Sequence, residues 1–179
     1  VYAARTAYIR RLAKPAEEIY AGLAGGRESF SLRYESSAGE EGVSLEQARE
    51  RLYEKLYGSH AADLAAGFTT VGPHRDDLTV EISGLSARTY ASQGQQRSAV
   101  LALKLAEASV LREVTGEQPV ALLDDVMSEL DVSRQDYILN HIHDWQVFLT
   151  CCDPSAVMRL SAGRAFHVER GRIQEETIA

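Results

Sequence analysis

A short apolar run that ends in two acidic residues constrains the fold of this chain more than any other feature. Residues 120–123 are all aliphatic, which is typical of a strand buried on both faces of a parallel sheet. Asp124 and Asp125 follow directly, and a second, largely apolar run at residues 146–150 lies beyond a helical segment. Alternating strands and helices predict an α/β fold. Open α/β sheets bind ligands at the carboxyl ends of their strands, where the two acids are expected.

The helical segment before this strand begins with an unusual polar sequence. Ser92 and Gln95 have the spacing of a capping box, and Gly94 lies between them in the first turn, at a cost of about 1 kcal/mol relative to alanine. A helix start with free N–H groups and a small residue suits an anion such as phosphate. A well-capped core helix with a tolerated glycine explains the same residues equally well. The helix is expected to end at Gly116 and to bury Val100, Leu101, Leu103, Leu105, Val110, Leu111 and Val114.

Caps, turns and hydrophobic periodicity predict the remaining elements. Helices are expected at residues 2–12 and 15–23, with Pro15 opening the second, and a strand at 30–34. A third helix, at 45–57, should start at the Ser44–Gln47 capping box, stop at Gly58 and be followed by an alanine-rich helix to Ala66. Further expected elements are strands at 78–82 and 88–90, a helix begun by Ser133 and Asp136, a short helix at 154–160 capped by Asp153, and a hairpin around Arg170 and Gly171.

Composition limits the class of protein. Hydrophobic content of 45% and charged content of 25% are ordinary for a globular chain, and no apolar run approaches the length of a membrane span. Cys151 and Cys152 are adjacent, so they form neither a disulfide framework nor a zinc site, and a reducing cytoplasm is the expected compartment. The start at Val1 without methionine resembles the middle of a helical region, so we expect a fragment of a longer chain.

Charge is unevenly distributed along the chain. The net charge of −7 argues against a protein that wraps nucleic acid over its whole surface. Residues 1–34, however, carry six Lys or Arg against three acids, whereas the rest carries thirteen against twenty-three. Such a basic cluster is more often a solvated helix face than a phosphate-binding surface. The candidate phosphate contacts are Arg5, Arg10, Arg11 and Lys14.

Three ordered motifs resemble those of the RecF family, which belongs to the SMC-like ABC ATPases. Residues 92–97 (Ser-Gln-Gly-Gln-Gln-Arg) resemble the signature motif of the family, and residues 122–131 resemble its combined Walker B strand and D-loop. The Gly-Pro-His-Arg-Asp-Asp-Leu run at residues 72–78 is a further hallmark. The specific resemblance covers residues 72–153. It implies the C-terminal part of an ABC/SMC-type P-loop ATPase head, at residues 70–179, preceded by the remainder of a helical lobe at residues 1–69.

The resemblance also implies roles for individual residues. In such ATPases two heads enclose ATP, so the signature residues Ser92, Gln93, Gly94, Gln95 and Arg97 are expected to contact nucleotide bound by the other subunit. Asp124 would position Mg²⁺ through water, and Asp125 would act as the general base. Many ABC ATPases have glutamate at the second position, so slow hydrolysis is expected. The D-loop residues Ser128, Glu129 and Asp131 would lie at the dimer interface, and Thr150 occupies the switch position.

Several residues near these motifs allow more than one interpretation. Thr150 can hydrogen-bond but cannot act as a charged imidazole sensor, and His141 and His143 are expected at the surface rather than as its substitutes. The effect of Cys151 and Cys152 next to the switch position is open. The polar residues at positions 74–77 either structure a turn or bind a ligand.

No G-x-x-x-x-G-K-[ST] phosphate loop occurs in the 179 residues. The resemblance implies that the complete protein supplies it, and that this chain alone binds ATP poorly and is inactive. For that protein it implies ATP-dependent homodimerisation, binding to gapped or junction DNA, and cooperation with RecR and RecO in recombinational repair, including the SOS response. The alternatives are another SMC-like head, such as an ATP-dependent nuclease of the overcoming-lysogenisation type, or a non-catalytic dimerisation module with an ABC-like fold.

Overall fold

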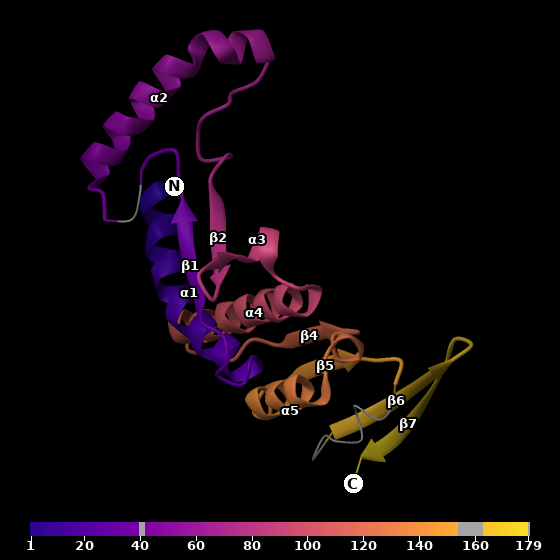
Figure 1. Cartoon of the computed structure of the whole chain (residues 1–179). Helices are drawn as coiled ribbons and strands as arrows, with labels where there is room; N and C mark the ends of the chain where they lie inside the picture. The colour runs from indigo at the N-terminus through magenta and orange to yellow at the C-terminus, as the bar shows by residue number, and fades with distance from the viewer. Residues whose placement is uncertain (40–41, 154–162, 179) are drawn as a thin grey trace. The chain divides into compact units, whose positions relative to one another are not determined.

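The computed structural model of the chain describes residues 1–39, 42–153 and 163–178 (Figure 1). The chain divides into two compact units, Val1–Val114 and Thr115–Ala179, and each is described by itself. Among the described helices, none combines the length and apolar character needed to cross a membrane.

The first unit combines helices with a three-stranded antiparallel sheet of order β1-β2-β3. Its elements are α1 (Tyr2–Leu23), β1 (Phe30–Glu35), α2 (Leu45–Ala66), β2 (Asp77–Ile82), β3 (Leu85–Ser86), α3 (Ala87–Tyr90) and α4 (Gln93–Thr115). β1 pairs with β2 over its whole length, from Phe30 opposite Ile82 to Glu35 opposite Asp77. Ser83 and Gly84 both have positive φ, which matches the two-residue turn between β2 and β3.

Helix α1 packs on β1 and forms the core of this unit. Its buried side chains recur with helical spacing: Ile9, Leu12, Ala16, Ile19, Tyr20 and Leu23. The Tyr20 ring stacks on Phe30 of β1 with a centroid separation of 4.9 Å. The two predicted helices are therefore one, and Pro15 lies inside it rather than at a helix start. Burial on both sides of Pro15 outweighs the hydrogen bond that its missing N–H removes.

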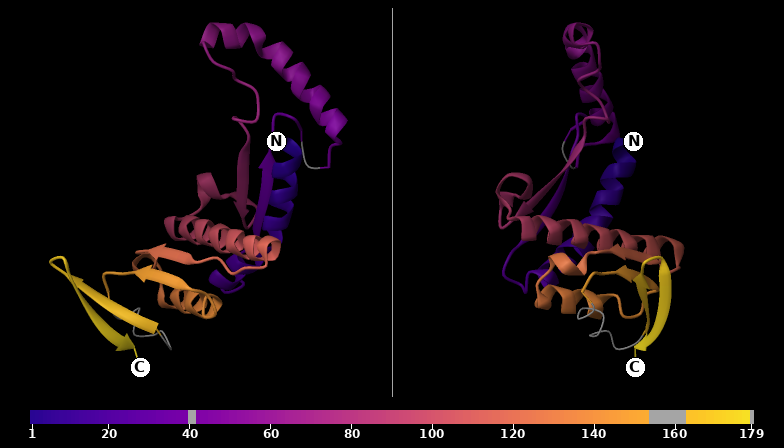
Figure 2. Two further views of the ribbon diagram at one scale, coloured as in Figure 1. Left: turned by 180° about the vertical axis from the view of Figure 1, so that it is seen from behind. Right: turned by 90° about the vertical axis from the view of Figure 1, so that its right-hand side faces the viewer.

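Helix α2 also continues where a stop was predicted. It runs through Gly58 to Gly67, whose φ of 75° ends it in the left-handed conformation. The Ser59 hydroxyl bonds to the Leu56 carbonyl and to the Asp63 carboxylate, which supports the helix just after Gly58. Figures 1 and 2 show α2 standing apart from the sheet, and only Ala48 is buried. Its apolar residues therefore do not form a core face, since Leu45 is 65% and Tyr53 69% exposed.

The chain between β2 and α4 differs from the prediction at one place. Residues 88–90 were expected as a strand, but Ala87–Tyr90 forms the single helical turn α3. The Gln96 side-chain amide donates to the carbonyls of Ala87 and Ala91, which holds this turn against the start of α4. Helix α4 buries Leu101, Leu105 and Val110 as expected but leaves Val100, Leu111 and Val114 exposed.

The second unit contains a parallel pair of strands and a hairpin. Its elements are β4 (Ala121–Asp124), the short 3-10 helix η1 (Met127–Glu129), α5 (Val132–His141), β5 (Val147–Thr150), β6 (Gly163–Glu169) and β7 (Arg172–Ile178). β4 and β5 are parallel, with Asp124 opposite Thr150, which confirms the predicted α/β pattern. β6 and β7 form the predicted hairpin, whose Arg170–Gly171 turn has positive φ at both residues.

Three details of the second unit correct or limit the sequence predictions. The strands are not buried on both faces, because Leu122 is 75% and Phe148 60% exposed. Helix α5 starts at the cap Asp131, whose carboxylate accepts the Arg134 N–H, and not at Ser133. The predicted helix at residues 154–160 lies outside the described residues.

Candidate functional site

The carboxyl ends of β4 and β5 bring Asp124, Asp125 and Thr150 together. The Thr150 hydroxyl donates to Asp124 Oδ1 and accepts the Asp125 N–H at 3.0 Å. The same N–H also points to the Thr150 carbonyl at 3.1 Å. One hydroxyl therefore fixes the side chain of the first acid and the backbone of the second. The residue assigned to the switch position by sequence is part of the acidic site.

Asp125 has an unusual backbone conformation. Its φ of 52° lies in the left-handed region, which non-glycine residues adopt at a cost and which is enriched at functional sites. Its carbonyl accepts the Ser128 hydroxyl at 2.9 Å, so the D-loop begins by folding back onto this residue. The Thr150 and Ser128 contacts together hold the Asp125 backbone in place, and its side chain is exposed at the end of the strand.

The D-loop is tied to the start of α5. The Gln135 amide donates to the carbonyls of Met127 and Leu130, and Met127 is fully buried. Asp131 accepts the Ser133 hydroxyl at 2.6 Å and lies 3.4 Å from the Arg134 guanidinium. The Ser133 hydroxyl and then the Arg134 N–H lower the pKa of the Asp131 carboxyl. Asp131 is thus a helix cap; Glu129 lies in η1, and its side chain is outside the described part of the chain.

The acidic site offers carboxylates of the kind that bind hydrated Mg²⁺. Among the described residues, no group of three or more His, Cys, Asp or Glu side chains is placed to hold a metal ion. Asp124 is an exposed carboxylate at the end of a parallel strand, with one oxygen already bonded to Thr150. Hydrated Mg²⁺ is commonly bound through one or two carboxylates and retained waters, which matches these donors.

The start of α4 carries the capping box predicted from sequence. The Ser92 N–H donates to Gln95 Oε1 at 2.8 Å, and the Gln95 N–H donates to Ser92 Oγ at 3.3 Å. The Gln96 N–H donates to the Ser92 carbonyl. Within the described chain, no acceptor takes the N–H groups of Gln93 and Gly94. These two donors and the Ser92 hydroxyl remain at the positive end of a 23-residue helix, which suits an anion.

Gln95 connects this helix start to the core. Its amide nitrogen donates to Glu28 Oε1 at 2.9 Å, while Glu28 Oε2 accepts the Tyr20 hydroxyl at 2.6 Å. Both ends of the Gln95 amide are therefore engaged within the chain, and Arg97, two residues further on, is half-buried. Sequence reasoning missed Glu28, because a contact across 67 residues leaves no local signal.

The polar turn at residues 72–77 divides into a buried and an exposed part. The side chain of Asp76 is 2% exposed and accepts hydrogen bonds from the Tyr34 hydroxyl and the Ser37 N–H. Arg5 of α1 donates to the Pro73 carbonyl and lies 3.4 Å from Asp76. Burial alone would raise the pKa of the Asp76 carboxyl, but these hydrogen bonds outweigh it and lower the pKa. Asp76 therefore structures the turn.

Replacing Asp76 with asparagine is expected to destabilise the protein by about 2 to 3 kcal/mol, the range for hydrogen bonds to a buried charge. A lowered pKa makes this stabilisation complete above about pH 4, the ordinary carboxyl value, and it is lost as pH falls through the folded-state pKa. Urea unfolding at pH 7 and pH 3 measures both effects. Asp77→Asn is the matched control, because that neighbour is exposed; equal losses for the two variants would contradict the assignment.

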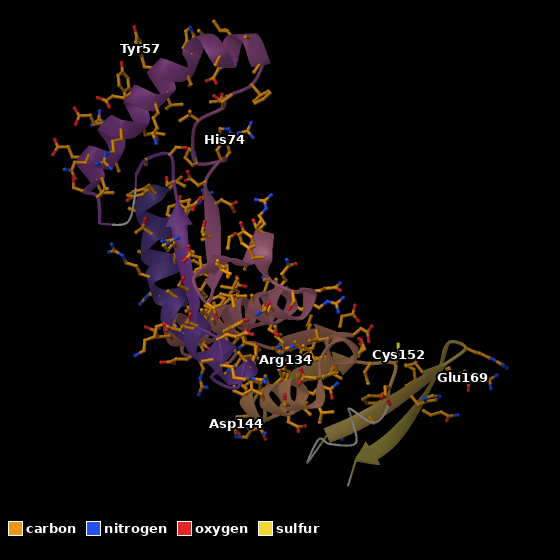
Figure 3. All side chains as sticks on the ribbon, in the orientation of Figure 1. Tyr57, His74, Arg134, Asp144, Cys152 and Glu169 are labelled. Carbon is orange, nitrogen blue, oxygen red and sulfur yellow. The ribbon has the colours of Figure 1, made fainter. Side chains whose placement is uncertain are left out.

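The exposed part of the turn consists of His74 and Arg75. His74 Nε2 lies 2.9 Å from the Thr69 carbonyl, and the Arg75 guanidinium stacks over the Phe68 ring at 5.1 Å. In Figure 3, His74 lies in the loop that follows α2. These contacts order the loop and leave both side chains at the surface.

The candidate phosphate contacts on α1 have mixed surroundings. Arg5 is committed to Pro73 and Asp76, Arg11 lies 3.6 Å from Glu113 of α4, and Lys14 lies 3.9 Å from Glu18. Arg10 and Arg11 border a shallow groove between α1 and α4, with Tyr8 and Leu111 in its apolar wall. All four basic residues are exposed, but acidic or carbonyl neighbours accompany at least three of them.

Two cysteines follow β5, and His141 lies in α5 before it. Burial raises the pKa of the Cys151 thiol, and the carboxylates of Asp153 and Asp125 act in the same direction. Cys152 is exposed (Figure 3), and both cysteines are free thiols. His141 is not a plain surface residue, because it stacks on Tyr137 and meets the edge of Trp145, and burial lowers its pKa.

The fold and the acidic strand end define the class: the chain has the architecture of the C-terminal part of an ABC/SMC-type ATPase head. A solved structure concerned with ATP-driven dimerisation of SMC ATPases matches with a TM-score of 0.61 at 13% identity, covering 100% of this chain and 90% of that one. An SMC head bound to the C-terminal winged-helix domain of ScpA matches with a TM-score of 0.58 at 16% identity, covering 95% of this chain and 43% of that one. At these identities the likeness shows the fold alone.

The relatives of higher identity than these SMC heads are RecF proteins. The DNA replication and repair protein RecF of Clostridium acetobutylicum is 37% identical over 174 residues, which is 96% of this chain and 47% of the relative. That of Lysinibacillus sphaericus is 40% identical over 164 residues, covering 89% and 44%. A solved structure of the recombination mediator protein RecF with ATP matches at a TM-score of 0.80 and 38% identity, covering 98% of this chain and 47% of that one. No family model matches the chain.

These similarities fit the C-terminal half of a RecF protein. The chain spans about half the length of the curated relatives it matches. The resemblance derived from the three sequence motifs is thereby confirmed.

Proposed function

We propose that this chain supplies one side of a nucleotide site that two copies of a RecF-like DNA-repair ATPase share. The carrying observation is the Thr150 hydroxyl, which bonds to Asp124 and to the Asp125 N–H at the carboxyl ends of two parallel strands. This is the place where α/β sheets bind ligands, and it holds two carboxylates in different surroundings. The ATP-bound RecF structure, at 38% identity, supports ATP as the ligand.

In this proposal the two acids have separate tasks. Asp124 orients water molecules around Mg²⁺, which would neutralise charge that develops on the phosphates. Asp125 accepts a proton from, or orients, the attacking water. An aspartate is one methylene shorter than the glutamate common at this position, so hydrolysis should be slow and suited to a switch rather than a motor.

The start of α4 serves the nucleotide of the other copy. The Ser92 hydroxyl and the N–H groups of Gln93 and Gly94 are the donors that would meet the γ-phosphate. The residues that hold the β- and γ-phosphates from the other side would come from a phosphate loop that these 179 residues do not contain. For this reason the chain alone should not hydrolyse ATP, and its activity belongs to the full-length protein.

The proposed biological setting rests on the names of the relatives rather than on the geometry of the site. Curated relatives are named DNA replication and repair proteins, and a solved one is placed in the RecFOR pathway. We accordingly propose binding to gapped or junction DNA, cooperation with RecR and RecO, and action in the cytoplasm. Arg5, Arg10, Arg11 and Lys14 stay candidate phosphate contacts. Reversing their charges should flatten the salt dependence of DNA binding by the full-length protein, and an unchanged slope would remove them.

The proposed organisation places residues 1–69 in a helical lobe and residues 70–179 in the head. That boundary stays a prediction, and β1 pairs with β2 across it. A nuclease alternative gains no support from the described residues, which contain no further acidic metal cluster. A dimerisation module that binds no nucleotide would not require the hydrogen bonds that Thr150 makes to Asp124 and Asp125.

Thr150→Val in the full-length protein tests the carrying observation. Valine keeps the shape of the side chain but removes the hydroxyl that bonds to Asp124 and Asp125, so ATP hydrolysis is expected to fall about 10-fold to 100-fold, the value of hydrogen bonds to charged groups. Thr150→Ser should keep most of the activity. Phosphate release at saturating ATP measures the rate, and a valine variant as active as the parent would exclude this role.

A further inference from the structure

The chain contains two capping boxes of the same composition, which makes a direct comparison possible. Ser44 and Gln47 open α2, and Ser92 and Gln95 open α4. In α2 both cap hydrogen bonds measure 3.2 Å, and in α4 they measure 2.8 and 3.3 Å. The backbone donors are therefore satisfied in the same way at both helix starts.

The two boxes differ in what holds the glutamine. The Gln95 amide nitrogen donates to Glu28, a half-buried residue in the turn that follows α1. Among the described residues, no carboxylate takes the amide nitrogen of Gln47, whose side chain is exposed. A capping box forms without such a partner, so the bond to Glu28 is an addition to the cap of α4.

Glu28 is itself fixed by the core. Its second carboxylate oxygen accepts the hydroxyl of Tyr20, which is fully buried and stacked on Phe30. A carboxylate has two acceptor oxygens and no donor, so each oxygen serves one of the two partners. Hydrogen bonds thus connect Tyr20 to Glu28, Glu28 to Gln95 and Gln95 to Ser92. They run without a break from the core beside the sheet to the start of α4.

This connection sets the orientation of the Gln95 amide. With its nitrogen on Glu28, its oxygen must face the Ser92 N–H, which keeps that donor occupied. The donors left for an incoming anion are then the Ser92 hydroxyl and the N–H groups of Gln93 and Gly94. Pre-oriented donors require no rearrangement when charge arrives, which is the main advantage of such sites.

We propose that Glu28 is a positioning residue of the shared nucleotide site, acting through Gln95 on the donors at the start of α4. The inference rests on the proposed function, because it assigns Glu28 to the ATP that two copies enclose. It predicts that the ability of residue 28 to hydrogen-bond to Gln95 and Tyr20 matters for the site. Glutamine at position 28 can accept from Gln95 with its oxygen and donate to the Tyr20 hydroxyl with its nitrogen, whereas alanine can do neither.

The experiment measures the ATP concentration that gives half-maximal dimerisation of the full-length protein by light scattering. Glu28→Ala is expected to raise this concentration about 10-fold, comparable to the loss of one hydrogen bond to a charged group. Glu28→Gln should stay within about twofold of the parent, because it restores both bonds. Gln47→Ala, at the other capping box, should leave the concentration unchanged. Urea unfolding without nucleotide is recorded for every variant.

Each outcome has a defined meaning. The positioning role is supported if Glu28→Gln keeps the ATP concentration of the parent, Glu28→Ala raises it, and both variants unfold at similar urea concentrations. Unchanged ATP dependence in Glu28→Ala overturns it, and so does a loss in Glu28→Gln as large as that in Glu28→Ala. If Glu28→Ala fails to fold, Glu28→Gln is compared with Tyr20→Phe, because only Tyr20→Phe removes the hydrogen bond between residues 20 and 28. A higher ATP concentration for Tyr20→Phe alone supports the role, and equal values for the two variants overturn it. A parent protein that forms no ATP-dependent dimer overturns the proposed function itself.

Discussion

Asp125→Asn in the full-length protein is expected to lower ATP hydrolysis about 1000-fold, within the range for removal of a general base. Asparagine tolerates the left-handed backbone as well as aspartate does, so the φ of 52° and the hydrogen bonds to Thr150 should persist. Only the proton acceptor is lost. Phosphate release measures the rate, and light scattering in ATP shows whether dimers still form, as they should.

The control for this substitution is Asp144→Asn. Asp144, labelled in Figure 3, lies in the same unit and its side chain is 78% exposed. Its carboxylate lies 3.0 Å from Nε2 of the neighbouring His143. The Asp144→Asn protein should hydrolyse ATP at the rate of the parent. A rate in Asp125→Asn within about threefold of the parent would show that another group activates the water, because such a ratio is far below the contribution of a general base.

Ser92→Arg is expected to weaken ATP-dependent dimerisation at least about 100-fold, the loss typical of a hot-spot position at an interface. The arginine removes the hydroxyl and fills the space in front of the N–H groups of Gln93 and Gly94. In the shared site this is where the phosphate of the other copy would lie. The molar mass in saturating ATP, measured by light scattering, should remain that of the monomer.

Ser44→Arg separates this effect from simple loss of a helix cap. Both serines cap a helix of more than 20 residues through the same pair of hydrogen bonds, so each substitution should cost about 1 kcal/mol of stability. Only Ser92→Arg should abolish the dimer. If both variants dimerise as the parent does, the start of α4 has no part in nucleotide binding.

The parts of the fold that sequence could predict are those with local causes. Both capping boxes, the Arg170–Gly171 hairpin and the parallel strands that end at Asp124 and Thr150 depend on residues a few positions apart. The acidic pair was found for the same reason, since an aliphatic strand followed by acids is visible in one short stretch. Thr150 was placed at the switch position by family resemblance alone.

The errors arose partly where tertiary contacts outweigh local preferences. Pro15 should interrupt a helix, but burial along α1 carries the helix past it. At Gly58 the reason is local, because Ser59 bonds to Leu56 and Asp63 within α2. Helix α5 begins at the cap Asp131 rather than at Ser133. The contacts of Asp76 join residues 39 to 71 positions apart, and Gln95 lies 67 positions from Glu28, so no local pattern could reveal these contacts.

Complementation between two impaired variants tests the central claim, a nucleotide site shared by two copies, most directly. Ser92→Ala and Asp125→Asn full-length proteins are assayed for ATP hydrolysis separately and after mixing in equal amounts. If α4 acts on the nucleotide of the other copy, half of the dimers are mixed and one of their two sites is intact, so the rate should reach about a quarter of the parent value. A mixture no faster than the mean of the separate variants would contradict the shared site.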